Sequence, residues 1–316
     1  MKTLPISIQI GLTHRCNLRC VHCDIWKAEK KEKELTTEEW KKVILKLKDW
    51  LGPFRLDIAE GEPFLRKDIL DIILFCDENN IRTVVTTNGT LIEKEKIKLL
   101  SKIKSLTLNI SLDGASPETH DYLRNFSDVY QKVMETLFYF NVNTRRCYIA
   151  IATILMGYNI DDIMLLLKKV LVDRLADSIN FQALTHNFDA PYHPKWYEQN
   201  PLWPKGEYKE KILKLLDNLI ELVKIGYPIN NPITQLEAMK RYFNNPSSDS
   251  IGKCNAGERN FIINSSGKVL LCWNMEPVGN ILDDEPEKIW NSISTNLRRR
   301  QIADCKRTCR ILNCNF

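Results

Sequence analysis

The chain has 316 residues, of which 44% are hydrophobic and 27% are charged. This composition is typical of a soluble globular protein with one large domain and a smaller one. The net charge of +5 comes from lysines dispersed along amphipathic stretches, which argues against a nucleic-acid-binding surface. No apolar run approaches the roughly 18 residues of a membrane span, and the N-terminus lacks a small-residue cleavage site. We therefore expect a cytoplasmic protein without a membrane span.

Short apolar strands alternate with amphipathic helices through the first 184 residues. The expected strands are 6–12, 54–59, 83–86, 106–111, 148–155 and 178–184. The expected helices between them are 37–50, 68–79, 93–101, 117–140 and 160–172. This alternation predicts parallel strands joined by right-handed crossovers, and strands apolar on both faces suggest that helices cover the sheet. Periodicity alone leaves a six-stranded partial barrel and an open doubly wound sheet as alternatives.

The alternation ends after residue 184. A segment rich in proline and aromatic residues, 185–208, leads into expected helices at 207–225 and 233–243. The polar run 244–253 predicts a linker, and 261–273 predicts a β-hairpin around Gly267. We therefore expect a barrel domain at 1–225, a helical connection at 226–253 and a small domain at 254–316.

Ten cysteines fall into two groups, apart from Cys76 and Cys147, which we expect in the core. In a reducing compartment such groups indicate metal binding rather than disulfides. Cys16, Cys20 and Cys23 follow the first strand. A four-iron cluster usually takes four thiolates, so three ligands in one loop leave one iron open to an exchangeable partner. A zinc site completed by His14 or His22 is the alternative.

The Cys16-x3-Cys20-x2-Cys23 spacing, with His22 where an aromatic residue is favoured, resembles that of the radical S-adenosylmethionine (SAM) superfamily. The resemblance implies a partial (β/α)6 TIM-like barrel and a [4Fe–4S] cluster whose open iron binds SAM. It also implies reductive cleavage of SAM to a 5′-deoxyadenosyl radical, with an external one-electron donor of the flavodoxin or ferredoxin type.

Motifs that follow successive strands fit the same resemblance. Glu60-Gly61-Glu62-Pro63 is similar to the Gly-Gly-Glu-Pro motif that binds the SAM amino group in the family, with Glu60 in place of the first glycine. The other SAM contacts that the resemblance implies are Thr87, Asn88, Ser111, Asp113, Arg124 and Leu184, together with His22. Arginine suits a carboxylate because its planar fork donates two parallel hydrogen bonds. A plain turn and a surface arginine remain the alternatives.

A second cysteine group lies near the C-terminus. It comprises Cys254, Cys272, Cys305, Cys309 and Cys314. The group and the hairpin resemble the SPASM/twitch extension of radical SAM enzymes, which implies one auxiliary [4Fe–4S] cluster. Its four ligands would be Cys254, Cys272 and two of the other three. Tetrahedral thiolate sites also accept zinc, so a structural zinc site is the alternative.

The substrate is the least constrained part of this interpretation. The first strand begins near residue 6, so we expect no room for a domain that binds a leader peptide. This favours a small-molecule substrate, such as a sugar or a nucleotide-linked or lipid-linked compound. A net two-electron oxidation of that substrate is one expected outcome. The first alternative is a radical SAM enzyme that matures ribosomal peptides. The second is a zinc-stabilised binding protein without catalysis. The segment from Tyr192 to Trp203 could cover the active site, so Asp189, Tyr192 and His193 are candidate proton acceptors.

Overall fold

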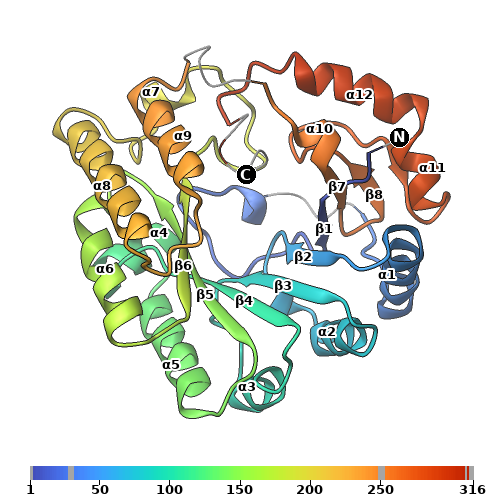
Figure 1. Cartoon of the computed structure of the whole chain (residues 1–316), viewed down its shortest axis with the longest axis horizontal. Helices are drawn as coiled ribbons and strands as arrows, with labels where there is room; N and C mark the ends of the chain where they lie inside the picture. The colour runs from blue at the N-terminus through green and yellow to red at the C-terminus, as the bar shows by residue number, and fades with distance from the viewer. Residues whose placement is uncertain (1–2, 28–31, 248–252, 310–311, 313–316) are drawn as a thin grey trace.

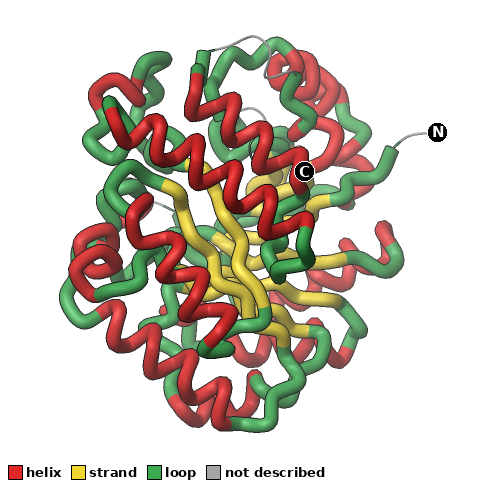
Figure 2. Tube along the Cα trace, turned by 60° about the vertical axis from the view of Figure 1, so that its left-hand side comes forward, coloured by secondary structure: helices red, strands yellow, loops and turns green. Residues whose placement is uncertain are grey.

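The computed structural model describes residues 3–27, 32–247, 253–309 and 312. Its centre is a sheet with the strand order β6-β5-β4-β3-β2-β1-β7-β8-β9 (Figures 1 and 2). The first six strands are β1 Ser7–Gly11, β2 Arg55–Ala59, β3 Arg82–Thr87, β4 Leu106–Ser111, β5 Tyr148–Leu155 and β6 Ser178–Ala183. Each pairs in parallel with its neighbours along the chain, so all six end at the same rim of the sheet.

The connecting helices pack on the outer face of this sheet (Figure 2). They are α1 Thr37–Leu51, α2 Ile69–Glu78, α3 Lys94–Leu100, α4 Pro117–Arg124, α5 Val129–Val142 and α6 Ile160–Val172. The sequence determines where α1 starts and stops. Thr36 and Glu39 form a reciprocal capping box at its start, and Gly52 follows its end with a φ of 70°.

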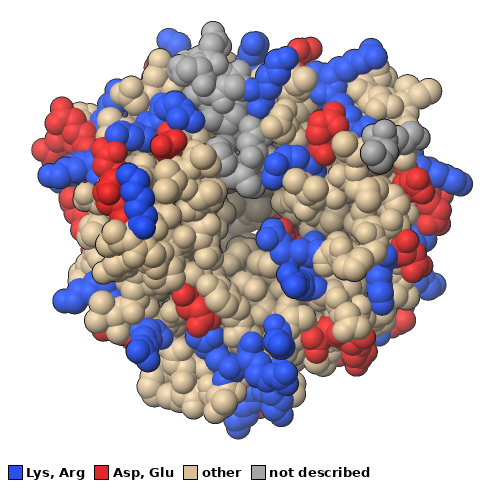
Figure 3. All heavy atoms as spheres, viewed as in Figure 1, with Lys and Arg blue, Asp and Glu red and all other residues tan. Residues whose placement is uncertain are grey.

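The two faces of the sheet differ. In β4, Leu106, Leu108 and Ile110 are buried beneath the helices, whereas Thr107, Asn109 and Ser111 on the other face are only partly buried. Helices therefore cover one face, and the other lines a hollow at the centre of the molecule (Figure 3). The expected partial (β/α)6 barrel is confirmed, while the expectation of strands covered on both faces is wrong, because the concave face keeps polar side chains for a site.

The single helix expected over 117–140 is two helices. Asn125 and Asp128 adopt left-handed φ values of 50° and 61°, which end α4 and redirect the chain. The Asp121 carboxylate then accepts hydrogen bonds from the backbone N–H groups of Asp128 (2.9 Å) and Tyr130 (2.7 Å) at the start of α5. A side chain from the first helix thus caps the second, which periodicity does not reveal.

Beyond β6, the chain forms α7 Trp196–Gln199, α8 Glu207–Lys224 and α9 Ile233–Asn244. The C-terminal part contains α10 Ala256–Arg259, β7 Asn260–Ile263, β8 Lys268–Leu270, β9 Gly279–Asn280, α11 Pro286–Trp290 and α12 Ile293–Ala303. Two short 3-10 helices, η1 Ile25–Lys27 and η2 Pro63–Leu65, lie earlier in the chain. The expected hairpin is confirmed, because β7 and β8 are antiparallel.

The C-terminal hairpin is joined to the barrel. Strand β7 pairs in parallel with β1, from Ser7 opposite Asn260 to Ile10 opposite Ile263. At this junction the rings of Trp50, Phe261 and Trp290 pack against one another. The smaller domain is therefore a continuation of the barrel sheet. Among the described residues, no helix is long and apolar enough to span a bilayer.

Candidate active site

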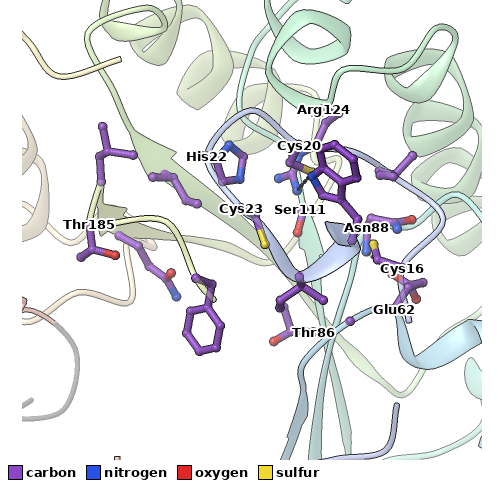
Figure 4. A pocket seen from close by; sticks show the side chains of 18 of the residues that line it. Cys16, Cys20, His22, Cys23, Glu62, Thr86, Asn88, Ser111, Arg124 and Thr185 are labelled. Carbon is purple, nitrogen blue, oxygen red and sulfur yellow. Dashed lines mark hydrogen bonds between the residues drawn. The ribbon is translucent and has the colours of Figure 1, made fainter. Parts of the chain in front are cut away.

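A cavity of about 340 Å³ opens at the rim where the parallel strands end (Figure 4). The loop after β1 and the ends of β2 to β6 all contribute to its wall. The residues that line it include Cys16, Cys20, His22, Cys23, Gly61, Glu62, Thr87, Asn88, Ser111, Arg124, Gln182, Leu184, Thr185, His186 and Phe188. Sites in parallel α/β barrels form at this rim because loops from every strand converge there.

The three N-terminal cysteines all line this cavity. Burial raises the pKa of Cys16 to about 11 and that of Cys23 to about 12, and it raises the pKa of Cys20. Buried thiols of this kind become thiolates when a cation binds them. Three soft sulfur donors around one cavity fit an iron–sulfur cluster.

The cysteine loop is anchored to the next motif along the rim. The side-chain amide of Asn17 donates to the Thr90 hydroxyl (2.9 Å), and that of Asn88 donates to the Asn17 carbonyl oxygen (2.8 Å). The backbone N–H of Val21 donates to the Leu123 carbonyl (3.0 Å), just before Arg124. Asn17 and Thr90 were not singled out from the sequence, and only their positions inside the two motifs could have indicated them.

Glu62 is a buried carboxylate with its own set of donors. Oε1 accepts hydrogen bonds from the Phe64 backbone N–H (3.0 Å) and the Thr87 hydroxyl (2.7 Å), and Oε2 accepts one from the Asn88 N–H (2.7 Å). Burial nevertheless raises the pKa of Glu62, because the hydrogen bonds only partly offset desolvation. The motifs after β2 and β3 therefore form one unit, with the Glu62 carboxyl group at the cavity wall.

Gly61 allows the chain to pass close to the cysteine loop. Its φ is 56°, and a Cβ there would lie 2.4 Å from the carbonyl oxygen of Arg15 and 2.5 Å from that of Thr13. The Glu62 N–H donates to the same Arg15 carbonyl (2.8 Å). Both the backbone conformation and the contact therefore require glycine at this position.

Arg124 supplies positive charge to the opposite wall. Its guanidinium forms an ion pair with the fully buried Asp113, 2.6 Å between Nη2 and Oδ2, and Nη1 lies 3.8 Å from the Cys20 sulfur. His22 lies nearby, and burial lowers its pKa to about 4. Its Nδ1 is buried with no hydrogen-bond partner among the described residues, so a bound ligand with a polar group would satisfy it.

Most of the expected cofactor contacts meet in this cavity. Two lie elsewhere: Pro63 starts the 3-10 helix η2, and Asp113 lies behind Arg124. The candidate proton acceptors Asp189, Tyr192 and His193 are outside the lining as well. Thr185, His186 and Phe188 from the same connection line the cavity instead, because the chain turns inward directly after β6.

Asp189 is engaged in a different contact. His14 places Nδ1 at 2.6 Å from Glu60 Oε1 and Nε2 at 2.6 Å from Asp189 Oδ2. Hydrogen bonds to Asp189 and Glu60 raise the pKa of His14 to about 10, so the ring is a cation between two carboxylates. Burial raises the pKa of Glu60, although the His14 contact opposes this shift.

The C-terminal cysteines have features of cluster ligands. The Asn274 N–H donates to the Cys272 sulfur and the Arg307 N–H to the Cys305 sulfur, each at 3.4 Å. Such bonds stabilise thiolate charge and tune iron–sulfur centres. Cys254 and Cys309 lie within the described residues, whereas Cys314 lies outside them.

The chain belongs to the radical SAM superfamily. Residues 10–170 match that family, and residues 254–315 match the SPASM family, an iron–sulfur cluster-binding domain. The expected [4Fe–4S] cluster with SAM, and the auxiliary iron–sulfur site at the C-terminus, follow from this membership.

Relatives span different parts of the chain. Fe-coproporphyrin III synthase of Methanosarcina barkeri is 37% identical over 128 residues, which is 40% of this chain and 32% of that protein. The antilisterial bacteriocin subtilosin biosynthesis protein AlbA of Bacillus subtilis is 26% identical over 301 residues, 92% of this chain and 60% of that protein. The chain thus spans less than two thirds of either relative.

A solved structure confirms the fold. Streptococcus suis SuiB bound to its precursor peptide SuiA has a TM-score of 0.73 with 19% identity, over 94% of this chain and 67% of that chain.

Proposed function

We propose that this enzyme uses a SAM-derived radical to modify a peptide, forming a crosslink or thioether. This proposal prefers the peptide-maturing alternative to the small-molecule substrate expected from the sequence. It is supported chiefly by the likeness to AlbA, a protein named for the biosynthesis of a bacteriocin, which extends over 92% of the chain. The likeness to Fe-coproporphyrin III synthase covers only 40% of the chain.

The residues of the cavity would bind and orient SAM. Cys16, Cys20 and Cys23 would hold the [4Fe–4S] cluster, Glu62 would accept a hydrogen bond from the amino group, and Arg124 would face the carboxylate. When bound, the cluster and SAM supply a 5′-deoxyadenosyl radical that abstracts hydrogen. The cavity volume of about 340 Å³ lies within the range of small-molecule sites.

Formation of a crosslink removes two hydrogens from the peptide. One would be taken up as an atom by the 5′-deoxyadenosyl group, and the other would leave as a proton. The auxiliary iron–sulfur centre of the C-terminal domain would supply an acceptor for the electron that remains. Cys254, Cys272 and two of Cys305, Cys309 and Cys314 would bind that centre. A flavodoxin or ferredoxin would supply the electron for SAM cleavage.

We propose that the chain is divided according to these binding roles. Residues 1–225 form the barrel that binds SAM, residues 226–253 form a connection, and residues 254–316 form the domain that binds the auxiliary cluster.

The test is anaerobic reconstitution with SAM, a reductant and short peptides encoded beside the gene. We expect a product lighter by two hydrogens and deuterium transfer from labelled peptide into 5′-deoxyadenosine. The Cys16→Ala/Cys20→Ala/Cys23→Ala variant should retain only the auxiliary iron and form no 5′-deoxyadenosine. Label arriving from a sugar, nucleotide or lipid-linked substrate, and from no peptide, would contradict the proposal. Zinc without iron in protein purified without oxygen would favour the binding-protein alternative.

A further inference from the structure

The contact between Glu60, His14 and Asp189 lies outside the cavity wall, and the proposed SAM chemistry does not use it. One imidazole joins a carboxylate at the end of β2 to a carboxylate that follows β6, with both nitrogens at 2.6 Å from an oxygen. In the sheet, β5, β4 and β3 lie between β6 and β2. The segment after β6 therefore crosses the mouth of the barrel to reach this contact, which we call the His14 clasp.

Two residues of the His14 clasp, Glu60 and Asp189, have strained backbone conformations. Glu60 has a φ of 80° and Asp189 has a φ of 63°, values that residues other than glycine rarely adopt. The Glu60 carboxylate also fills the space above Gly11, where a Cβ would lie 1.7 Å from Oε2. Glycine at position 60 would adopt this backbone conformation without strain. What Glu60 adds relative to glycine is therefore its carboxylate, which contacts His14.

The segment that Asp189 anchors forms part of the cavity wall. Phe188 lines the cavity and bridges in parallel with Cys23. Its carbonyl oxygen accepts from the Asp24 N–H (3.1 Å), and the Asn187 amide donates to the Asp24 carboxylate (3.3 Å). Residues 187–189 thus pass from β6 to the cysteine loop and are then held by His14.

We propose that His14 is a positioning residue: by bridging Glu60 and Asp189 it holds the segment after β6 across the mouth of the barrel and keeps Phe188 in the wall beside Cys23. This inference does not depend on a peptide substrate. It assigns Glu60 and Asp189 to an anchor, outside the cavity, for the segment that contributes Phe188 to the cavity wall.

Glu60→Gly separates this role from general stability, because it removes one anchor and relieves the backbone strain. In the reconstituted full-length chain, we expect amide hydrogen exchange of residues 185–190 to rise about tenfold or more, since a hydrogen bond to a charged group is lost. The thermal midpoint should not fall. Asp189→Ala should raise exchange in the same residues. Glu198→Gln, an exposed carboxylate in the same connection, is the matched control and should change nothing.

SAM affinity, measured by equilibrium binding, provides a second readout. Both single variants should weaken SAM binding by a similar factor. The Glu60→Gly/Asp189→Ala double variant should bind SAM no more weakly than either single variant, because each substitution breaks the same clasp. Gly11→Ala should increase exchange of 185–190 in the natural chain and not in the Glu60→Gly background. Unchanged exchange in both single variants, a rise spread over the whole chain, or additive losses in the double variant would each overturn the proposal.

Discussion

Asp113 and Arg124 form a buried ion pair directly behind the SAM cavity. The two side chains are 0% and 9% exposed, and 2.6 Å separates Oδ2 of Asp113 from Nη2 of Arg124. Asp113 Oδ1 also accepts a hydrogen bond from the Ile154 N–H at the end of β5 (2.9 Å). The pair therefore links the ends of two strands to the arginine of the cavity wall.

We expect Arg124→Met to destabilise the protein by about 3–5 kcal/mol, because it leaves the Asp113 charge buried without a partner. Urea denaturation of the metal-free chain measures this loss. Arg124→Met/Asp113→Asn should recover a large part of the stability, since the unpaired charge is gone. Equal losses in the single and double variants would show that the ion pair does not determine the effect.

Gly61→Ala should weaken SAM binding by at least about tenfold, because the new methyl group must displace the Thr13 and Arg15 carbonyls and with them the cysteine loop. Gly52→Ala is the matched control. Gly52 also has a positive φ, of 70°, yet a Cβ there meets nothing within 4 Å. The two variants should lose similar backbone stability, but only the first should lose affinity in equilibrium binding of SAM to reconstituted protein.

The Asp68 carboxylate should make the stability of the protein fall as the pH is lowered. Burial alone would raise its pKa, but hydrogen bonds from Arg66 and Thr37 outweigh it and hold the pKa below its usual range. The contribution of ionised Asp68 to the free energy of unfolding is therefore fully present above the pKa of about 3.9 that the group has in the unfolded chain. It is lost as the pH falls through the lower pKa of the folded state.

Asp68→Asn should cost about 2 kcal/mol at pH 7, and the difference from the natural chain should disappear in strong acid. Urea midpoints measured from pH 7 down to the acid limit of folding provide the check. A penalty independent of pH would mean that the Asp68 charge is not involved.

Single cysteine replacements should identify the auxiliary ligands. Cys254→Ala and Cys272→Ala should each lower the iron content from about eight to about four per chain. Of Cys305, Cys309 and Cys314, one should tolerate alanine without loss of iron. Cys76→Ala and Cys147→Ala are the controls, because both side chains are buried in the core. Iron loss from either control would contradict our division of the cysteines.

Much of this architecture could be predicted because its signals are local. The strand 106–111 and the helix 160–172 have the bounds expected from the sequence, since apolar periodicity defines them. Spacing likewise brought Cys16, Glu62 and Arg124 to one rim, because every motif follows a parallel strand. The break at Asn125 was missed because apolar periodicity does not show the left-handed φ values of Asn125 and Asp128, or that Asp121 of the first helix caps the second.

The contacts of Asp189 were also beyond prediction. Its partner His14 lies far away along the chain, and no periodic pattern joins the end of β2 to the segment after β6. The same holds for Asn17 and Thr90, whose bond crosses between two loops. Such polar contacts depend on the positions of single atoms after folding, so composition and spacing carry no signal of them.

The parallel pairing of β1 with β7 has a mechanical consequence. A ladder of backbone hydrogen bonds fixes the spacing between the loop that follows β1 and the hairpin that carries Cys272. A hinge between the cysteine loop and this hairpin would have to break that ladder, so the distance from the cysteine loop to Cys272 should stay constant during turnover. Any change of shape that admits a substrate must then come from the rim segments rather than from rotation of one half against the other.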